Sequence, residues 1–396
     1  MSKAIKRVAI STGGGDAPGL NAVIHGAVYA ARGLGWEILG IRDGFGGLQE
    51  PEKYPDGGVV QLRRPMVRNI AHLGGTILGT TNRGNPLCRV TEGPDGTKTV
   101  TDCSDELVRR FDELGIEALI AVGGDGSLTI ANELHKKGLC VIGVPKTIDN
   151  DLDSTAMTFG FNTAVEFATD CIDRLHSTAL AHQRIMVVEV MGRYVGWIAL
   201  YCGIAGRADA ILIPEIPYDI KKVAAHLKSR HEEGKPYSIV VVAEGAKPAG
   251  GEVTVKSREI GRLERLGGVG ETVAAQLQEL TGKESRTVVL GHLLRGGTPT
   301  ALDRNLGVTL GAGAVDGLSK GKSGVMVAIW PPKLEFVPLD EAVAKLKYVP
   351  LDSQGVVVGR ALDISFGDEW TRRTKQEFGM AHGRTSGDSP GDPIGG

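Results

Sequence analysis

The stretch "ALIAVGGDGSLTIANELHKKGLCVIGVPKTIDND", residues 118–151, joins two apolar runs through a segment with helical patterning. The runs at 118–123 and 140–145 are continuously apolar, as is typical of strands buried on both faces. The residues between them, 126–137, are long enough for a helix that connects two parallel strands. The stretch therefore predicts a β–α–β unit and a parallel sheet covered by helices.

The same alternation continues over most of the chain. Further strand-like runs lie at 8–11, 184–190, 210–214, 238–245, 287–291 and 325–330. Helical patterns lie at 19–34, 104–114, 162–178, 219–233, 269–281 and 301–318. The sequence thus predicts an α/β protein with mostly parallel sheets. Residues 90–101 are expected to form a hairpin, and the residues from 371 onward a disordered tail with little to bury.

The composition excludes several function classes. The chain has 396 residues, 41% of them hydrophobic, which is enough for two domains with sizeable cores. A formal net charge of -2 gives no electrostatic footprint for nucleic acid or an anionic membrane. No secretory signal and no membrane span is apparent. The five cysteines form no CxxC pair, which favours reduced thiols in a cytoplasmic protein.

Two glycine-rich loops follow predicted strands. In parallel sheets, ligands bind beyond the carboxyl ends of the strands. Gly13, Gly14 and Gly15 precede a helix whose free N–H groups suit an anion, although an ordinary tight turn would have the same composition. The second loop, residues 123–127, adds Asp125, a ligand type that Mg²⁺ shares with phosphate oxygens. Ser127 is expected to cap the helix that follows. The alternative for Asp125 is that it is simply the N-cap of this helix.

The third loop carries carboxylates close together. Asp149, Asp151 and Asp153 follow the strand at 140–145, and Lys146 lies three residues before the first of them. Asp149 and Asp151 would repel each other at one point, so they have separate roles or share a cation. A general base that deprotonates an attacking hydroxyl is one interpretation of Asp149. A solvated turn rich in aspartate and asparagine is the other.

Basic residues flank two later strands. Arg193 follows the strand at 184–190, and His292 and Arg295 follow the strand at 287–291. Arginines at strand ends are usually surface residues. A sugar phosphate, however, is typically bound by bidentate hydrogen bonds from guanidinium groups. Arg184 and Arg286 lie at the strand entrances, away from the carboxyl ends. If they bind ligand, they most easily reach the site of a neighbouring subunit, which predicts an oligomer.

Together these motifs resemble the phosphofructokinase A family, whose members phosphorylate fructose 6-phosphate at its 1-hydroxyl. The resemblance covers roughly residues 6–365 and rests on GGDAPGLN, GGTILGT, GGDGS, PKTIDND, HQR, MGR, GHLLRGG and the pair Asp303–Arg304. It implies two similar three-layer domains with the active site in the cleft between them. The donor domain would comprise 1–160 plus about 294–345, and the sugar domain 161–293 plus about 346–370.

The resemblance also implies roles for individual residues. Asp149 would be the catalytic base, assisted by Lys146, Thr147 and Arg193. The phosphoryl donor would lie on Gly14, Asn82, Arg83, Gly124, Asp125, Gly126 and Ser127, with Mg²⁺ on Asp125. Fructose 6-phosphate would contact Thr147, Ile148, Asp149, Met191, Gly192, Arg193, Glu244, His292 and Arg295, joined by Arg184 and Arg286 of an adjacent subunit in a dimer or tetramer.

Two positions give opposite indications about the donor. Members of the family that use ATP carry glycine at the position of Gly126, whereas users of pyrophosphate carry aspartate there. At Lys146 the short bacterial ATP enzymes have glycine and the pyrophosphate enzymes lysine. An aspartate at this position would collide with the α-phosphate of ATP. The identity of residue 126 therefore restricts the donor more than that of residue 146, and Gly126 predicts ATP. The combination resembles the mixed-substrate group of the family.

Departures from the family pattern leave other assignments open. His25 and Tyr29 replace arginines of the regulated bacterial forms, which puts the usual nucleotide effector site in doubt. Asn82 stands where those forms have arginine, and Arg83 next to it is expected to supply the charge.

Three other functions share part of this sequence pattern. A pyrophosphate-dependent phosphotransferase would act on the same sugar. A non-catalytic sugar-phosphate regulator would not need the base. A diacylglycerol-kinase-like or NAD-kinase-like enzyme would share only the GGDGS loop.

Overall fold

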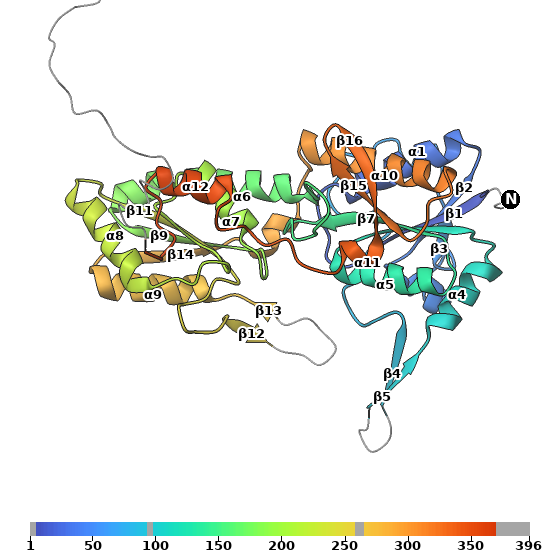
Figure 1. The fold of residues 1–396 in the computed structure, drawn as a ribbon, viewed down its shortest axis with the longest axis horizontal. Helices are drawn as coiled ribbons and strands as arrows, with labels where there is room; N and C mark the ends of the chain where they lie inside the picture. The colour runs from blue at the N-terminus through green and yellow to red at the C-terminus, as the bar shows by residue number, and fades with distance from the viewer. Residues whose placement is uncertain (1–4, 93–97, 258–264, 370–396) are drawn as a thin grey trace, which may run out of the picture.

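The computed structural model describes residues 5–92, 98–257 and 265–369, and it contains two separate α/β units (Figure 1). The tail expected from residue 371 onward lies outside the described residues. Among the helices of the described ranges, none combines the length and apolar character needed to cross a bilayer.

The first unit is built on an eight-stranded sheet with the order β16-β15-β7-β6-β1-β2-β3, and β8 pairs with β7. Its central strands are parallel, and antiparallel strands close both edges. The strands are β1 (Arg7–Thr12), β2 (Glu37–Ile41), β3 (Val59–Gln61), β6 (Ala118–Gly123), β7 (Val141–Thr147), β8 (Phe159–Gly160), β15 (Val325–Trp330) and β16 (Lys333–Pro338).

Helices cover both faces of this sheet. Successive residues of the strands point to opposite faces, so Val8 and Ile10 enter one core while Ala9 enters the other. The first core is closed by α1 (Leu20–Gly33) and α10 (Ala301–Ser319), and the second by α4 (Ser104–Glu113), α5 (Asp125–Lys136) and α11 (Leu339–Ala342). The short elements are α2 (Gly46–Gln49), η1 (Pro51–Lys53) and α3 (Arg64–Val67).

The second unit has a four-stranded, fully parallel sheet with the order β10-β11-β9-β14. The strands are β9 (Ile185–Val190), β10 (Ala210–Leu212), β11 (Ser238–Ala243) and β14 (Ser285–Val289). One face packs on α6 (Phe161–His182), α7 (Trp197–Ala205) and α12 (Gln354–Ala361), the other on α8 (Ile220–Glu232) and α9 (Val269–Thr281). Two three-layer units with mostly parallel sheets confirm the predicted fold class.

Two hairpins project from the body (Figure 1). The first pairs β4 (Cys88–Glu92) with β5 (Lys98–Asp102), as predicted for residues 90–101. The second pairs β12 (Val255–Ser257) with β13 (Arg265–Leu266).

The strand predicted at 140–145 extends further than expected. It continues to Thr147 because Lys146 and Thr147 pair with Phe159 and Gly160 of β8. Lys146 therefore belongs to a rigid strand rather than to the loop that follows it.

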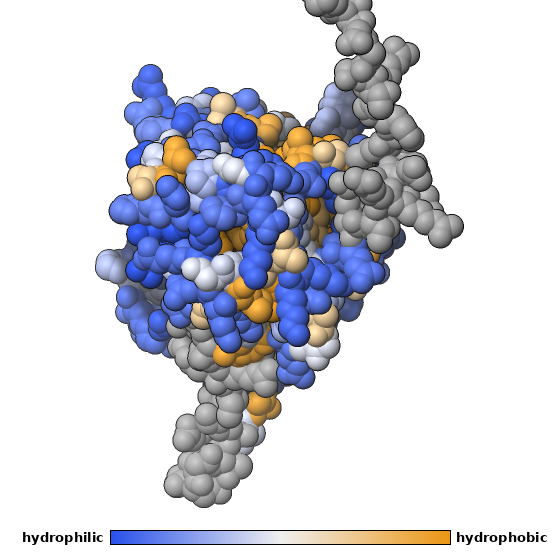
Figure 2. Space-filling view, turned by 90° about the vertical axis from the view of Figure 1, so that its left-hand side faces the viewer, coloured by the Kyte–Doolittle hydropathy of each residue, from blue (hydrophilic) through white to orange (hydrophobic). Residues whose placement is uncertain are grey.

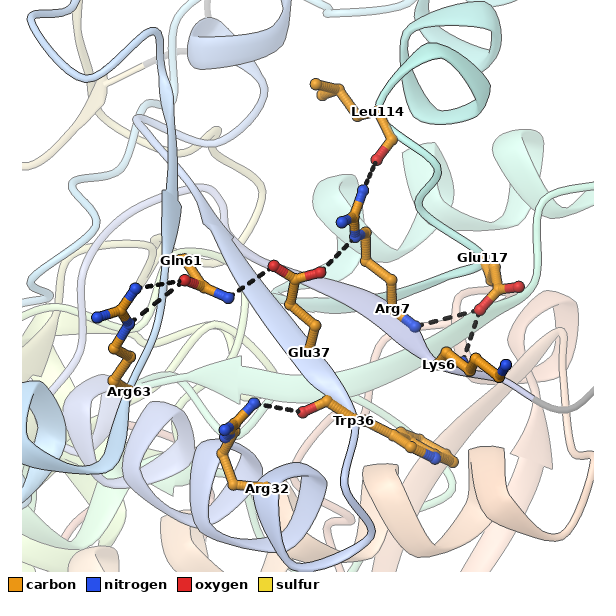
Figure 3. A network of polar contacts seen from close by, with 9 residues as sticks. All are labelled: Lys6, Arg7, Arg32, Trp36, Glu37, Gln61, Arg63, Leu114 and Glu117. Atoms are coloured by element: carbon orange, nitrogen blue, oxygen red, sulfur yellow. Dashed lines mark hydrogen bonds and ion pairs between the residues drawn. The ribbon is translucent and has the colours of Figure 1, made fainter.

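Polar contacts tie together the amino edge of the first sheet (Figure 3). The Arg7 Nε donates to Glu37 at 2.6 Å, and Gln61 donates to the other oxygen of Glu37 at 2.6 Å. The Arg7 NH1 donates to the carbonyl of Leu114 at 2.7 Å, and the Glu117 carboxylate accepts the backbone N–H of Arg7 at 3.1 Å. This end of the sheet is thus fixed by side chains, and the loops at the opposite end are left for other contacts.

The helices α1 and α10 pack so closely that Gly311 and Gly26, which lie at their contact, leave no room for a side chain. A β-carbon at Gly311 would overlap the carbonyl oxygen of Val23, and one at Gly26 would overlap that of Val308. Since both obstacles are backbone atoms of packed helices, they have little room to move.

We expect Gly311→Ala to lower the free energy of unfolding by about 1–3 kcal/mol, the usual cost of overpacking. Urea unfolding measures it, with Thr309→Ala, an exposed position of the same helix, as the control. An unchanged or raised stability in Gly311→Ala would show that the two helices can separate without cost.

Candidate active site

The predicted ligand loops meet at one edge of the first sheet. The strands β1, β6 and β7 are parallel neighbours, with Thr12 opposite Val122 and Gly123 opposite Pro145. Because the carboxyl ends of these parallel neighbours lie at the same edge of the sheet, the loops after them emerge side by side.

The first glycine loop lies directly against Lys146. Gly14 has a φ of 79°, in the left-handed region that favours glycine. A β-carbon at this position would lie 3.3 Å from the Lys146 Nζ and 3.4 Å from the Ser127 Oγ. The Lys146 ammonium donates to the carbonyl of Gly15. The side chain of Lys146 in β7 therefore restrains this loop through a hydrogen bond.

The second glycine loop opens onto free space. Gly124 is the N-cap of α5, and no side chain caps this helix. The expectation that Ser127 or Asp125 acts as the cap is wrong, because both lie inside the first turn, and Ser127 packs against Gly13 and Gly123. Asp125 is exposed, and a β-carbon at Gly126 would meet nothing within 4 Å.

Residues 80–83 lie beside the first glycine loop. The backbone N–H of Gly14 donates to the carbonyl of Thr81 at 3.0 Å, and the Thr80 hydroxyl donates to the carbonyl of Gly14 at 2.7 Å. Asn82 and Arg83 follow directly and are exposed. Both are thus near the predicted donor loop, with side chains free to reach a ligand.

The carboxylate of Asp149 is buried at the end of β7. Its residue is only 3% exposed, and the Oδ1 atom has no hydrogen-bond partner among the described residues. Its backbone N–H donates to the Thr147 hydroxyl at 3.1 Å, and Ile148 beside it is fully buried. A buried carboxylate oxygen without a donor is costly, and a ligand hydroxyl would supply one.

Charged groups from both sheets act on Asp149. Burial is the main cause that raises the pKa of this carboxyl group above its usual range, and Glu244 adds to the rise. Arg295, Arg193 and Lys146 act in the opposite direction, in that order. A carboxylate with a raised pKa next to cations suits proton abstraction near neutral pH.

Asp151, for which the sequence predicts either a role separate from that of Asp149 or a shared cation, is buried two residues after Asp149. Burial, followed by the neighbouring carboxylates of Asp149 and Asp125, raises its pKa to about 7. Asp151 thus interacts electrostatically with both of the other carboxylates. Its spacing of two residues from Asp149, directly after a buried strand, was the signal available in the sequence.

Lys146 is a buried cation. It is 3% exposed, and burial, with a smaller effect of Arg295, lowers its pKa to about 8. The carboxylates of Asp149, Asp151 and Asp16 oppose this change. Lys146 therefore connects the glycine loop to the carboxylates.

A second cluster follows β9. Gly192 has a φ of 148° and Arg193 a φ of 50°, so the loop turns sharply after the buried Met191. The backbone N–H of Arg193 donates to Glu244 at 3.1 Å. A β-carbon at Gly245 would overlap the carbonyl oxygen of Arg193. Glu244, which follows β11, thus fixes the backbone of this loop.

Arg295 joins the two units. It ends η2 (Gly291–Arg295), which follows β14, while its partners lie in the first unit. Its Nη1 donates to the carbonyl of Asp16 at 3.1 Å, and a β-carbon at Gly15 would lie 2.7 Å from this nitrogen. His292 of the same turn is exposed.

Arg184 and Arg286 do not join this cluster. They lie at the amino ends of β9 and β14, where both pair with Glu284, Arg184 at 3.0 Å. The predicted position at the strand entrances is therefore confirmed. The structure brings these two arginines together, away from Asp149.

The first unit offers a setting that fits Mg²⁺. Mg²⁺ takes one or two carboxylates together with phosphate oxygens and water. Asp125 and Asp151 are near enough that one raises the pKa of the other, which a divalent cation would reverse. Within the described residues no group of three or more potential ligands forms a complete metal cage.

Glycine loops, a buried lysine and clustered carboxylates at the carboxyl ends of a parallel sheet define this chain as an α/β phosphotransferase. The family model for phosphofructokinase matches residues 7–318. The chain therefore belongs to the phosphofructokinase family.

Relatives within the family differ in the donor that their names state. The chain is 48% identical to an ATP-dependent 6-phosphofructokinase of Chloroflexus aurantiacus, over 93% of this chain and 100% of the relative. It is 46% identical to a pyrophosphate–fructose 6-phosphate 1-phosphotransferase of Amycolatopsis mediterranei, over 87% of this chain and 97% of that one. The crystal structure of Pichia pastoris phosphofructokinase in the T-state matches with a TM-score of 0.71 and 30% identity, over 92% of this chain and 37% of that chain.

We expect the Lys146 side chain to titrate near pH 8, against an ordinary lysine value of 10.5. NMR of the protein labelled with ¹³C at the lysine ε carbons measures this, and Lys146→Met assigns the signal. If every lysine titrated above pH 10, Lys146 would be hydrated and not buried.

Proposed function

We propose that this chain is an ATP-dependent 6-phosphofructokinase, which transfers the γ-phosphoryl group of ATP to the 1-hydroxyl of fructose 6-phosphate in glycolysis. Relatives named ATP-dependent 6-phosphofructokinase, 48% and 43% identical over 93% and 92% of the chain, support the activity. The observation that carries the mechanism is the buried, unpartnered Oδ1 of Asp149 between cations of both units.

Asp149 is the base in this proposal. The 1-hydroxyl of the sugar donates to its free Oδ1 and loses the proton as the phosphoryl group arrives in line. The backbone N–H of Asp149 donates to the Thr147 hydroxyl, which restrains the backbone that carries the carboxylate. No phosphoenzyme is required.

Positive charge offsets the charge that develops during transfer. The Lys146 ammonium contacts the glycine loop that would carry the donor phosphates, so it would offset this charge. Arg193 acts from the sugar side. Mg²⁺ on Asp125, when bound, would neutralise donor phosphate oxygens.

The remaining site residues divide between the two ligands. ATP would lie on Gly14, Asn82, Arg83, Gly124, Asp125, Gly126 and Ser127. Fructose 6-phosphate would contact Thr147, Ile148, Met191, Gly192, Arg193 and Glu244, with His292 and Arg295 on its phosphate. We accordingly assign 1–160 plus about 294–345 to the donor and 161–293 plus about 346–370 to the sugar.

We expect Asp149→Ser to lower turnover by about 10²–10⁴, the range of a general base, while fructose 6-phosphate still binds. Initial rates and equilibrium sugar binding measure the two effects. Asp153→Ser is the matched control, because Asp153 lies in the same stretch and pairs with Lys345 at 3.0 Å. Turnover of Asp149→Ser within about threefold of the wild type would rule out the base assignment.

ATP is favoured as the donor by the space at Gly126. A β-carbon there would meet nothing within 4 Å, so the loop leaves room for a nucleotide. Pyrophosphate is the second candidate, since Lys146 matches its users and a relative with that named activity is 46% identical.

Initial rates with ATP and then with pyrophosphate, at equal concentration with Mg²⁺ and fructose 6-phosphate, separate the two donors. We expect activity with ATP. Gly126→Asp should lower it roughly a thousandfold, because like charges about 4 Å apart repel by about 4 kcal/mol near a protein surface. Gly126→Ala is the control for bulk alone. Activity with pyrophosphate only would overturn the choice of ATP.

We further propose a homo-oligomer, a dimer or a tetramer, in which Arg184 and Arg286 reach the sugar phosphate of a neighbouring subunit. Their place at the strand entrances supports this, because the Asp149 site of the same chain lies at the other strand ends.

Subunit complementation tests the shared site. Asp149→Ser and Arg286→Ala chains should each be poorly active alone. Mixed oligomers should regain activity, because one site then combines an intact Asp149 with an intact Arg286. Co-expression with two affinity tags isolates them, and mixed oligomers as inactive as their parents would place Arg286 outside the neighbour's site.

A further inference from the structure

One segment of the chain crosses between the two units next to the candidate site. It comprises residues 343–353, between α11 and α12, and runs from the first unit to the second (Figure 1). On its way it lies against the loop between β7 and β8, residues 148–158, which we call the carboxylate loop. Leu346 of the crossing segment forms an antiparallel bridge with Leu152 of this loop. The crossing segment therefore contacts the backbone that carries the proposed base.

Lys347 bonds the carboxylate loop at two places. Its backbone N–H donates to the carbonyl of Asp151 at 2.9 Å. Its Nζ donates to the carbonyls of Thr155 at 3.0 Å and Ala156 at 2.7 Å. Hydrogen bonds from a charged donor are roughly twice as strong as those between neutral groups. The side chain of Lys347 thus fixes the later part of the loop, while its backbone fixes the middle.

Lys347 is held away from water. Lysine side chains are mostly exposed, and the end of the second unit that Figure 2 faces is accordingly covered largely by hydrophilic residues. Lys347 is half-buried instead, and burial lowers its pKa from the ordinary lysine value of 10.5. Asp153, the second cause, acts in the opposite direction. Because a buried ammonium needs hydrogen-bond partners, the folded chain keeps its bonds to the loop.

Lys347 also contacts the second unit. The Trp197 Nε1 donates to the Lys347 carbonyl at 2.7 Å, and the Lys347 Nζ lies 5.6 Å from the centroid of the Trp197 ring. That distance suits a cation–π contact. Trp197 is the first residue of α7 and follows Arg193 by four residues. Lys347 is thus bonded on one side to the carboxylate loop and on the other to the helix that follows the Arg193 loop.

Glu215 adds a second connection between the crossing segment and this helix. Its Oε1 accepts the backbone N–H of Val349 at 2.9 Å and that of Gly196 at 3.0 Å. Gly196 is the N-cap of α7. A β-carbon at Gly196 would lie 2.8 Å from the Oε2 of Glu215, so the packing leaves no room for a side chain there. The crossing segment and the start of α7 are therefore held together.

We propose that Lys347 is a positioning residue that aligns the carboxylate loop with the loop carrying Arg193. The inference rests on the proposed function, because Asp149 and Arg193 are the groups that would act on one sugar. They belong to different units, so their separation depends on contacts that cross between the units. Arg295 makes another such contact, but its bond ends at Asp16 in the first glycine loop. Lys347 bonds the carboxylate loop directly.

Loss of this alignment should affect turnover more than binding. The backbone N–H of Asp149 has its own bond to Thr147, and that of Arg193 its own bond to Glu244. Each unit therefore still offers its part of the site to its ligand when Lys347 is replaced. The distance between the base and the sugar changes, and a misplacement of about 1 Å can lower a rate about a hundredfold. The effect is thus expected in kcat and not in KM.

Steady-state kinetics of Lys347→Met test the alignment, with turnover counted per site that binds fructose 6-phosphate at equilibrium. We expect kcat to fall by about 10- to 100-fold, and the KM for the sugar and for ATP to stay within about threefold. Lys347→Arg, which keeps a cation that donates to two carbonyls, should recover most of the loss. Lys345→Met is the matched control and should keep the wild-type kcat, because Lys345 of the same segment is exposed and pairs with Asp153.

A double-mutant cycle separates this link from the stability of the fold. Trp197→Phe keeps an aromatic ring and removes the N–H that donates to Lys347. Because both residues act through one connection, we expect the effects of Lys347→Met and Trp197→Phe on kcat to be far from additive.

Turnover of Lys347→Met within about threefold of the wild type would overturn the role of Lys347. A loss that Lys347→Arg shares in full, or effects that add in the double variant, would overturn it as well. A wild-type chain that transfers no phosphoryl group to fructose 6-phosphate from either donor would instead refute the proposed function together with this inference.

Discussion

Burial of both faces of the parallel sheets is the constraint on which the remaining structure depends. A strand such as β6, fully buried along its length, has room for polar chemistry only where it ends. Since parallel neighbours end at one edge, the polar loops of β1, β6 and β7 have no other place to gather. The glycines of these loops let the backbone approach Lys146 and Ser127 so closely that side chains would not fit. The packing of helices on both faces of the sheets thus determines the core and also the position of the site.

The charged groups at the end of β7 are buried, so water does not stabilise their charges. Asp149 and Lys146 are each 3% exposed, and burial is the main cause of the pKa shift of both. Burying them costs free energy that the mutual attraction recovers only in part. The shifts bring the two groups closer to neutral pH from opposite sides. A base that still accepts a proton and a cation that is still charged can then coexist.

The sequence predicted which loops lie at the candidate site, but it did not predict the contacts between them. Apolar runs mark β1, β6 and β7, so the loops after them could be located from periodicity alone. The extension of β7 to Thr147 could not, because it depends on pairing with β8, a strand of only two residues. The reach of Arg295 to Asp16 joins residues 279 positions apart.

The path of the chain between the two units has a mechanical consequence. It leaves the first sheet at α6, returns at α10, and leaves again between α11 and α12. Three connections at separate points resist a wide hinge, because each would have to twist by the same amount. A small sliding of one unit against the other is the movement that such a linkage permits. The same linkage means that cutting any single connection would leave the units tethered, so neither can be exchanged as an independent module.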